Sequence, residues 1–176
     1  MLIQRPLPVF IGADGARAEL KPVKLGAGTF DEGWLQDLIH RNPTILPISE
    51  IERAFGDVLA VAREVPCGHG FIDNLFVTPD GNIVLVETKL WRNSQMRREV
   101  VAQTLDYVAA LSGMSYGDLE KCIAKAQHRP TSLYDVVRNH PDAFDEPDFI
   151  DAVATNLRRG RVLAIAQGGV MSLDVV

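Results

Sequence analysis

Three charged residues interrupt apolar stretches between positions 71 and 89 of the sequence. Asp73 lies within the stretch 71–77, and Glu87 and Lys89 follow the continuous apolar run 83–86. A charged group buried without a partner is strongly unfavourable, so these carboxylates need compensation. A divalent cation such as Mg²⁺ would supply it, because it prefers oxygen ligands and bridges to phosphate. A neighbouring lysine could orient an attacking water and offset phosphate charge.

The segment Thr78-Pro79-Asp80-Gly81-Asn82 indicates how the two stretches pair. It suits a three-residue hairpin loop, in which a type I turn is followed by glycine in the left-handed position. In that register Asp73 lies opposite Glu87 on one face, and Lys89 points to the same face. A two-residue loop would pair Asp73 with Thr88 and separate the carboxylates. The alternative to a metal site is a Glu87–Lys89 salt bridge at a strand end, with Asp73 exposed.

The elements that must position these residues follow from apolar periodicity and turn residues. Strands are expected at 58–65, 71–77 and 83–89. We expect a helix before them, capped by Thr29 with Glu32 in capping-box spacing and ended by Asn42-Pro43. A helix beginning at Asn93-Ser94 and ended by Ser112-Gly113 should follow them.

Apolar periodicity gives that long helix a buried stripe of Met96, Val100, Leu105, Val108 and Leu111. The other expected elements are a hairpin of strands at 9–11 and 18–25, helices at 49–55, 116–127, 133–139 and 147–159, and strands at 161–166 and 171–175. Strands flanked by helices predict an α/β structure, a small mixed β-sheet between helices.

Length and composition bound the class of protein. The 176 residues suit one domain, and a net charge of −5 argues against coating nucleic acid by bulk charge. No apolar run reaches the roughly 18 residues of a membrane helix, and no secretory leader pattern is present, so no membrane partner is expected. The two cysteines are expected to be reduced thiols of a cytoplasmic protein. The sequence leaves open whether the protein forms a homo-oligomer.

Four ordered motifs resemble the PD-(D/E)XK nuclease superfamily, in particular its RecB-like and NucS-like endonuclease branch. They are Glu32-Gly33-Trp34-Leu35-Gln36, Gly70-Phe71-Ile72-Asp73-Asn74-Leu75, Glu87-Thr88-Lys89 after its apolar strand, and Gln103-Thr104-Leu105-Asp106-Tyr107. The resemblance covers about residues 30–112. Asn74 and Thr88 replace commoner apolar residues, and Ile72 stands where the family has proline.

The resemblance implies a restriction-endonuclease-like core at 29–113, with an N-terminal β-hairpin extension at 1–28 and a helical extension with closing strands at 114–176. It implies a nuclease that uses Mg²⁺ or Mn²⁺ on nucleic acid, in DNA repair, processing or defence, with DNA the expected substrate and RNA left open.

The resemblance also assigns roles to individual residues. The metal ligands would be Asp73, Glu87 and the Thr88 backbone carbonyl, with Lys89 orienting the water. Glu32 would support the metal site or serve only as a helix cap. Gln103 and Tyr107 share a helix face and would contact Lys89 or the scissile phosphate, although Tyr107 could equally be core.

Further candidates surround this set. Trp91, Arg92, Arg97 and Arg98 form, with Lys89, a local basic segment that suits phosphate contacts and base stacking. The alternative is a solvated helix start. Arg158, Arg159 and Arg161 make a second basic patch. Glu64, on the preceding strand, could reach the site or pair with Arg63 or Arg53.

Two other functions stay open on the sequence. The same fold could have lost catalysis and bind only nucleic acid or a protein. Alternatively, the charged strand end could pair internally in a structural domain.

Overall fold

The computed structural model describes residues 9–19, 30–89 and 94–168. Its elements are β1 (Val9–Ile11), β2 (Arg17–Glu19), α1 (Glu32–Arg41), the 3₁₀ turn η1 (Pro43–Ile45), α2 (Ile48–Ile51), β3 (Leu59–Cys67), β4 (Gly70–Val77), β5 (Ile83–Lys89), α3 (Ser94–Ser112), α4 (Tyr116–Gln127), α5 (Tyr134–Val137), α6 (Glu146–Arg158) and β6 (Val162–Gly168). Within these ranges, no helix has the length and apolar character needed to cross a membrane.

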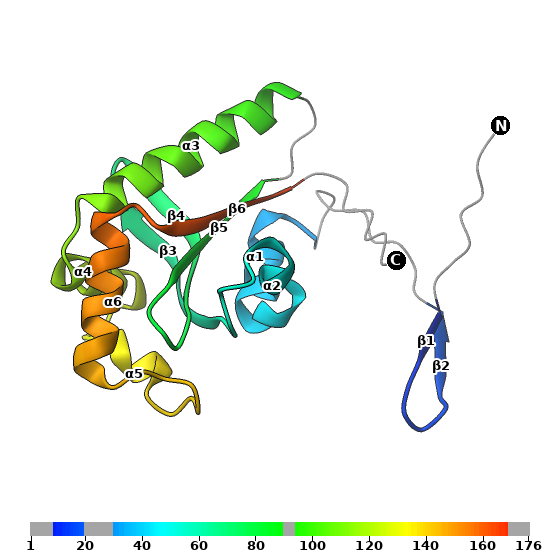
Figure 1. The fold of residues 1–176 in the computed structure, drawn as a ribbon. Helices are drawn as coiled ribbons and strands as arrows, with labels where there is room; N and C mark the ends of the chain where they lie inside the picture. The colour runs from blue at the N-terminus through cyan, green and yellow to red at the C-terminus, as the bar shows by residue number, and fades with distance from the viewer. Residues whose placement is uncertain (1–8, 20–29, 90–93, 169–176) are drawn as a thin grey trace.

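The central sheet has the order β3-β4-β5-β6 (Figure 1). The first three strands form antiparallel pairs, whereas β6 runs parallel to β5. A parallel neighbour needs a crossover connection, and α3 to α6 supply it. The expected mixed α/β structure around a small sheet is therefore confirmed. β1 and β2 pair antiparallel in a separate two-stranded sheet, as the predicted hairpin requires.

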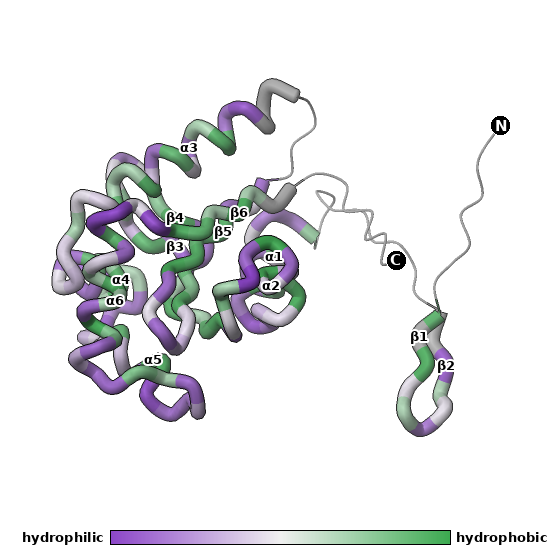
Figure 2. Tube along the Cα trace, in the orientation of Figure 1, coloured by the Kyte–Doolittle hydropathy of each residue, from purple (hydrophilic) through white to green (hydrophobic). Residues whose placement is uncertain are grey.

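Helices cover both faces of the central sheet. Ile83 and Leu85 pack into a core shared with α3, α4 and α6, whereas Val84 and Val86 pack into a smaller core with α1 and α2. β5 is thus buried on both faces, which explains its continuous apolar run. Figure 2 shows this hydrophobic strand in the middle of the fold.

The β4–β5 hairpin has the predicted register. Val77 pairs with Ile83, and the ladder continues to Asn74 and Val86. Gly81 has a φ of 84°. The Gly81 N–H donates to the Thr78 carbonyl at 3.0 Å, and the Thr78 N–H to the Asn82 carbonyl at 2.9 Å. The three-residue loop with glycine in the left-handed position is therefore confirmed.

The expected start of α1 is wrong. Asp31 is the N-cap, because its Oδ1 accepts the Trp34 N–H at 2.8 Å, and Glu32 is the first helical residue. Thr29 lies outside the described residues. Asn42 ends the helix as expected.

The predicted apolar stripe of α3 is wrong at Leu105, whose exposed fraction is 62%. The buried stripe is Val100, Thr104, Tyr107 and Leu111. Five residues rotate a helix by about 140°, so Leu105 points away from Val100 toward solvent. The side chain of Met96 lies outside the described residues.

Other boundaries differ by a few residues. The helices predicted at 49–55 and 133–139 are the shorter α2 and α5, and the helix predicted at 147–159 begins and ends one residue earlier as α6. Within the described residues β2 covers Arg17–Glu19, and the rest of the predicted strand 18–25 and the predicted strand 171–175 lie outside them.

Candidate functional site

The two carboxylates meet where the β4–β5 ladder ends. One residue beyond the Asn74–Val86 pair, the Asp73 N–H donates to Glu87 Oε1 at 3.2 Å. Asp73 Oδ2 accepts two hydrogen bonds of 2.7 Å, from the Thr88 N–H and the Thr88 hydroxyl. The predicted register is confirmed as far as the Asn74–Val86 pair, and beyond it the Asp73 backbone lies against the Glu87 carboxylate; that the two carboxylates share one face stays a prediction. Thr88 thus anchors one oxygen of the Asp73 carboxylate.

Glu87 is buried, with an exposed fraction of 4%. Burial, and after it the negative charge of Asp73, raises the pKa of Glu87 to about 8. The Oε1 atom of Glu87 accepts the Asp73 N–H. A buried carboxylate close to a second carboxylate is suited to binding a cation.

Lys89 pairs with Glu32 across the start of α1. The Lys89 Nζ lies 3.4 Å from Glu32 Oε2, and both side chains are partly exposed. The positive charge of Lys89 also acts to lower the pKa of Glu87, less strongly than burial raises it. The structure therefore brings Glu32, Lys89, Glu87 and Asp73 together at one end of β5. The predicted Glu87–Lys89 salt bridge is not among the ion pairs of the described residues.

A polar clamp fixes α1 against the sheet and so fixes Glu32. Arg63 on β3 donates to Asp37 Oδ1 at 3.2 Å, to Gln36 Oε1 at 3.0 Å and to the Gly33 carbonyl at 3.3 Å. Asn74, next to Asp73, donates to the Gln36 carbonyl at 3.3 Å. Sequence analysis missed this role of Arg63 and Asn74. The signal that could have indicated it is a polar residue within an otherwise apolar strand, at Arg63 and again at Asn74.

Gln103 and Tyr107 are together on α3, as their spacing predicts. The Gln103 Nε2 donates to the Tyr107 hydroxyl at 2.7 Å, and the Phe71 N–H donates to the same oxygen at 3.2 Å. Tyr107 is buried, and burial raises its pKa. A Cβ at Gly70 would lie 2.5 Å from the hydroxyl oxygen, so the strand carries glycine where Tyr107 approaches. Tyr107 thus joins α3 to β4 two residues before Asp73.

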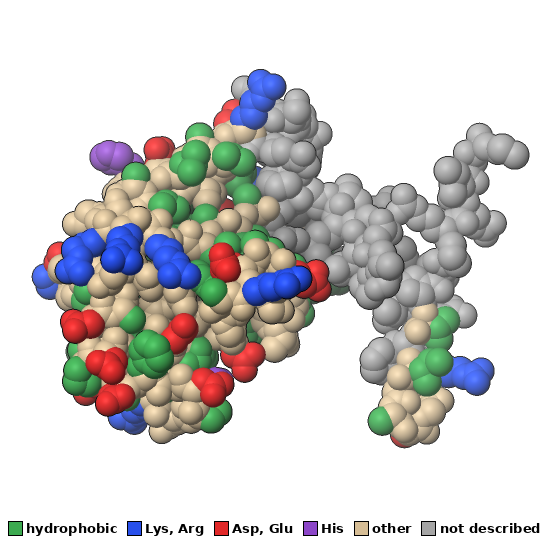
Figure 3. Space-filling model, in the orientation of Figure 1, with side chains coloured by type: hydrophobic (Ala, Val, Ile, Leu, Met, Phe, Trp, Pro, Cys, Tyr) green, Lys and Arg blue, Asp and Glu red, His purple; other side chains and the backbone are tan. Residues whose placement is uncertain are grey.

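The predicted nucleic-acid contacts are described only in part. Arg98 is exposed on α3, whereas Trp91, Arg92 and the side chain of Arg97 lie outside the described residues. Arg158, Arg159 and Arg161 are exposed where α6 ends and β6 begins. Figure 3 shows basic side chains in a row above an acidic group on this face.

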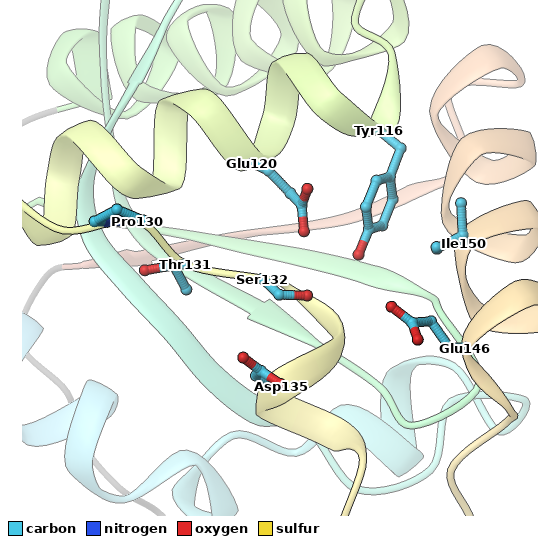
Figure 4. Close-up of a pocket in the computed structure, with 8 residues that line it drawn as sticks. All are labelled: Tyr116, Glu120, Pro130, Thr131, Ser132, Asp135, Glu146 and Ile150. Carbon is cyan, nitrogen blue, oxygen red and sulfur yellow. The ribbon is translucent and has the colours of Figure 1, made fainter.

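A hollow of about 460 Å³ lies between α4, α5 and α6. Glu120 and Tyr116 reach into it from α4, and Glu146 from α6 (Figure 4). Glu120 is already bonded, because it accepts the Leu133 N–H at 2.8 Å. The hollow is lined by three carboxylates, those of Glu120, Asp135 and Glu146. They would repel phosphate, so this hollow does not suit a phosphodiester.

Within the described residues, no three His, Cys, Asp or Glu side chains lie close enough together to hold a metal ion. Asp73 and Glu87 are two oxygen-bearing residues that fit a hard cation, and the Thr88 carbonyl as a third ligand stays a prediction. Comparisons with family models, curated proteins and solved structures find no match to this chain. The function is therefore inferred from the site itself.

Proposed function

We propose that this chain is a metal-dependent nuclease that hydrolyses phosphodiester bonds of nucleic acid, with DNA as the first substrate to test. The observation that carries the proposal is the buried Glu87 carboxylate against Asp73, with a pKa raised to about 8 and with Lys89 on the same strand. A buried carboxylate whose charged form is so unfavourable without a bound cation is typical of functional sites. The mixed sheet agrees with a restriction-endonuclease-like core, which we propose as the finer fold.

Asp73 and Glu87, with the Thr88 carbonyl, would hold Mg²⁺ or Mn²⁺. The bound cation would polarise a phosphoryl oxygen and lower the pKa of a water molecule. Thr88 fixes Oδ2 of Asp73, leaving Oδ1 for a ligand. Lys89 would orient the attacking water and offset the negative charge that develops on the phosphate. Glu32 would hold the Lys89 ammonium at this end of β5.

Gln103 and Tyr107 have a positioning role in this proposal. The Tyr107 hydroxyl accepts two hydrogen bonds and retains its own proton, on the side of the sheet that carries Glu87. Its contact with the Phe71 N–H fixes β4 just before Asp73.

The test is a cleavage assay on single-stranded, duplex and branched oligonucleotides with Mg²⁺ and with Mn²⁺. Lys89→Gln keeps most of the side chain and removes its charge. We expect it to lower turnover by about a hundredfold or more, because the interaction matters most in the transition state, and to change binding less than about tenfold.

The matched control is Lys121→Gln, an exposed lysine paired with Asp118 on α4, which should leave turnover unchanged. A wild-type protein that binds the oligonucleotides but cleaves none of them would instead support a non-catalytic nucleic-acid-binding domain.

A further inference from the structure

Three arginines lie close together in the chain where α6 ends and β6 begins. Arg158 is the last residue of α6, Arg159 is its C-cap, and Arg161 directly precedes β6. All three are exposed, and Figure 3 shows basic side chains in a row on this face. We call Arg158, Arg159 and Arg161 the arginine patch. In a chain with a net charge of −5, this patch is a local exception to the overall charge.

No carboxylate of the described residues forms an ion pair with the arginine patch. Arginines on α1, on β3 and at the end of α5 do form ion pairs. Acidic partners are near the patch, because Asp80 and Asp151 line a hollow of about 400 Å³ together with Arg159 and Arg161. Asp80 instead accepts hydrogen bonds from two side chains of its own hairpin loop. The positive charge of the patch therefore stays available for an external anion.

Helix capping does not account for these side chains. Basic side chains near a helix C-terminus can donate to the last carbonyl groups of the helix. In α6, the main-chain N–H groups of residues 159–161 bond those carbonyl groups, at 2.9–3.1 Å. Among the described residues, the hydrogen bond from a side chain of the patch joins Arg158 to the Thr155 hydroxyl at 3.0 Å. The guanidinium groups are thus not used as caps.

Arg161 is held in position by an aromatic ring. Its guanidinium carbon lies 5.9 Å from the centroid of the Phe55 ring, and Phe55 is buried in the core that α1 and α2 share with the sheet. A guanidinium group stacked on a ring keeps its N–H donors at its edge, where they match the oxygens of a phosphate. An arginine fixed in this way and without an ion-pair partner in the described structure suits a phosphate ligand.

Strand β6 connects the arginine patch to the candidate site. Val162, the residue after Arg161, pairs with Ile83, and Ala166 pairs with Glu87. Figure 1 shows β6 leading from the end of α6 along β5. The five residues from Arg161 to Ala166 span roughly 17 Å at about 3.3 Å each. Phosphates follow one another about every 3.4 Å along each strand of duplex DNA, so the span corresponds to about five nucleotides.

We propose that the arginine patch binds backbone phosphates of the same nucleic acid that is cleaved at Asp73 and Glu87, an inference that rests on the proposed function. The substrate is then a polymer that reaches at least about five nucleotides from the cleaved bond, rather than a nucleotide or a short fragment. Contacts to phosphates position the substrate and carry no base sequence, so the patch adds affinity for any sequence.

The first test measures binding of a DNA duplex of about 15 base pairs, long enough to cover both places. Fluorescence anisotropy in EDTA, on an Asp73→Asn background of the full-length chain, gives the affinity at several salt concentrations. Arg159→Gln should reduce the slope of log affinity against log salt by about 0.9, the contribution of one phosphate contact. Changing all three arginines of the patch to glutamine should reduce the slope by about 2.7.

The matched control is Arg129→Gln, which should leave the slope unchanged. Arg129 is exposed and donates to Gln127, whose own side chain donates to the Val61 carbonyl on β3. It therefore lies near the other edge of the sheet from β6.

The second test measures cleavage of the same duplex with Mn²⁺. Arg159→Gln should raise KM several-fold with little effect on kcat, because the patch binds the substrate away from the reacting bond. Patch variants that keep the wild-type salt slope and KM would overturn this inference, and cleavage by the wild type would leave the proposed function standing. A lower kcat at unchanged KM would also contradict the inference. A wild-type protein that neither binds nor cleaves the duplex would overturn the proposed function as well.

Discussion

Glu87 makes the stability of the cation-free protein depend on pH. Its ordinary pKa is 4.5, and burial beside Asp73 raises it to about 8 in the folded protein. Between these values the folded state holds a proton that the unfolded state releases. The free energy of unfolding therefore falls as pH rises from about 4.5 to about 8 and no longer depends on this group above that range.

The variant Glu87→Gln removes this dependence. In EDTA at pH 8.5, we expect its Tm to exceed that of the wild type by several degrees, because the buried charge is gone. Near pH 4.5 the two proteins should melt within about 1 °C, since Glu87 is then neutral in the folded state. Thermal melts at both pH values check this, with Glu50→Gln as the control. A Tm difference that is the same at both values would mean that charge burial at Glu87 does not govern stability.

The sequence predicts the meeting of Asp73 and Glu87 because a short turn fixes the register of a hairpin. It does not predict the Thr88 hydroxyl bond to Asp73, because alternation places Thr88 on the other face. It also gives no sign of the left-handed Glu64, since the usual signal is a glycine. The Thr88–Asp73 bond and the left-handed backbone of Glu64 depend on how two strands separate or turn, and tertiary packing sets both.

At the scale of elements, the polar clamp holds α1 and with it Glu32. The variant Arg63→Ala leaves Gln36 and Asp37 without their shared donor and should cost about 1–3 kcal/mol in the free energy of unfolding. Arg41→Ala is a matched control, because Arg41 also pairs with Asp37 but on the exposed side of α1. It should cost at most about 0.5 kcal/mol. Urea denaturation measures both, and equal losses would refute the clamp.

Gly81 fixes the hairpin against α6. It has a positive φ, and an added Cβ would lie 2.9 Å from the Ala152 Cβ and 3.2 Å from the Phe149 carbonyl oxygen. Gly81→Ala should therefore cost about 2 kcal/mol or more, from backbone strain plus overpacking.

Gly56 is the control for this substitution, because an added Cβ there meets nothing within 4 Å and its φ is not positive. Gly56→Ala should leave the unfolding free energy nearly unchanged or slightly higher. A similar effect of the two substitutions in urea titrations would argue against the packing of the hairpin on α6.

The sequence predicts the ends of an element where an apolar run and a turn motif coincide. It fails where a single signal has to fix the end or the buried face. The strands β4 and β5 combine an apolar run with a defined turn, and their predicted ends match the structure to within a residue. At the start of α1, capping-box spacing to Glu32 predicts Thr29 as the cap, whereas the structure has Asp31 there. In α3, Leu105 was assigned to the core by its apolar character, although Thr104 occupies the buried stripe.

At the scale of the whole molecule, the net charge of −5 means that the proposed nucleic-acid substrate would have to be bound by a local basic surface rather than by overall attraction. On the face in Figure 3 several basic side chains lie in a row above a group of acidic ones, which is the kind of local surface that such binding would need. Overall fold class followed from the order of strands and helices. The position of a binding surface does not follow from that order, because it depends on which exposed side chains the fold brings together.

Salt dependence tests whether the basic segment beside the site meets phosphates. If Lys89, Arg92, Arg97 and Arg98 each contact one, the logarithm of the binding constant should fall with log salt with a slope of about 3 to 4. Arg98→Ala should reduce that slope by about 0.7–0.9, the contribution of one phosphate contact. Fluorescence anisotropy in EDTA, on an Asp73→Asn background, measures binding without cleavage. The control is Arg138→Ala, an exposed arginine paired with Asp135 beside the acidic hollow, which should leave the slope unchanged. If Arg138→Ala changed the slope and Arg98→Ala did not, nucleic acid would bind at the α5–α6 end, and the Asp73–Glu87 site would lose its substrate.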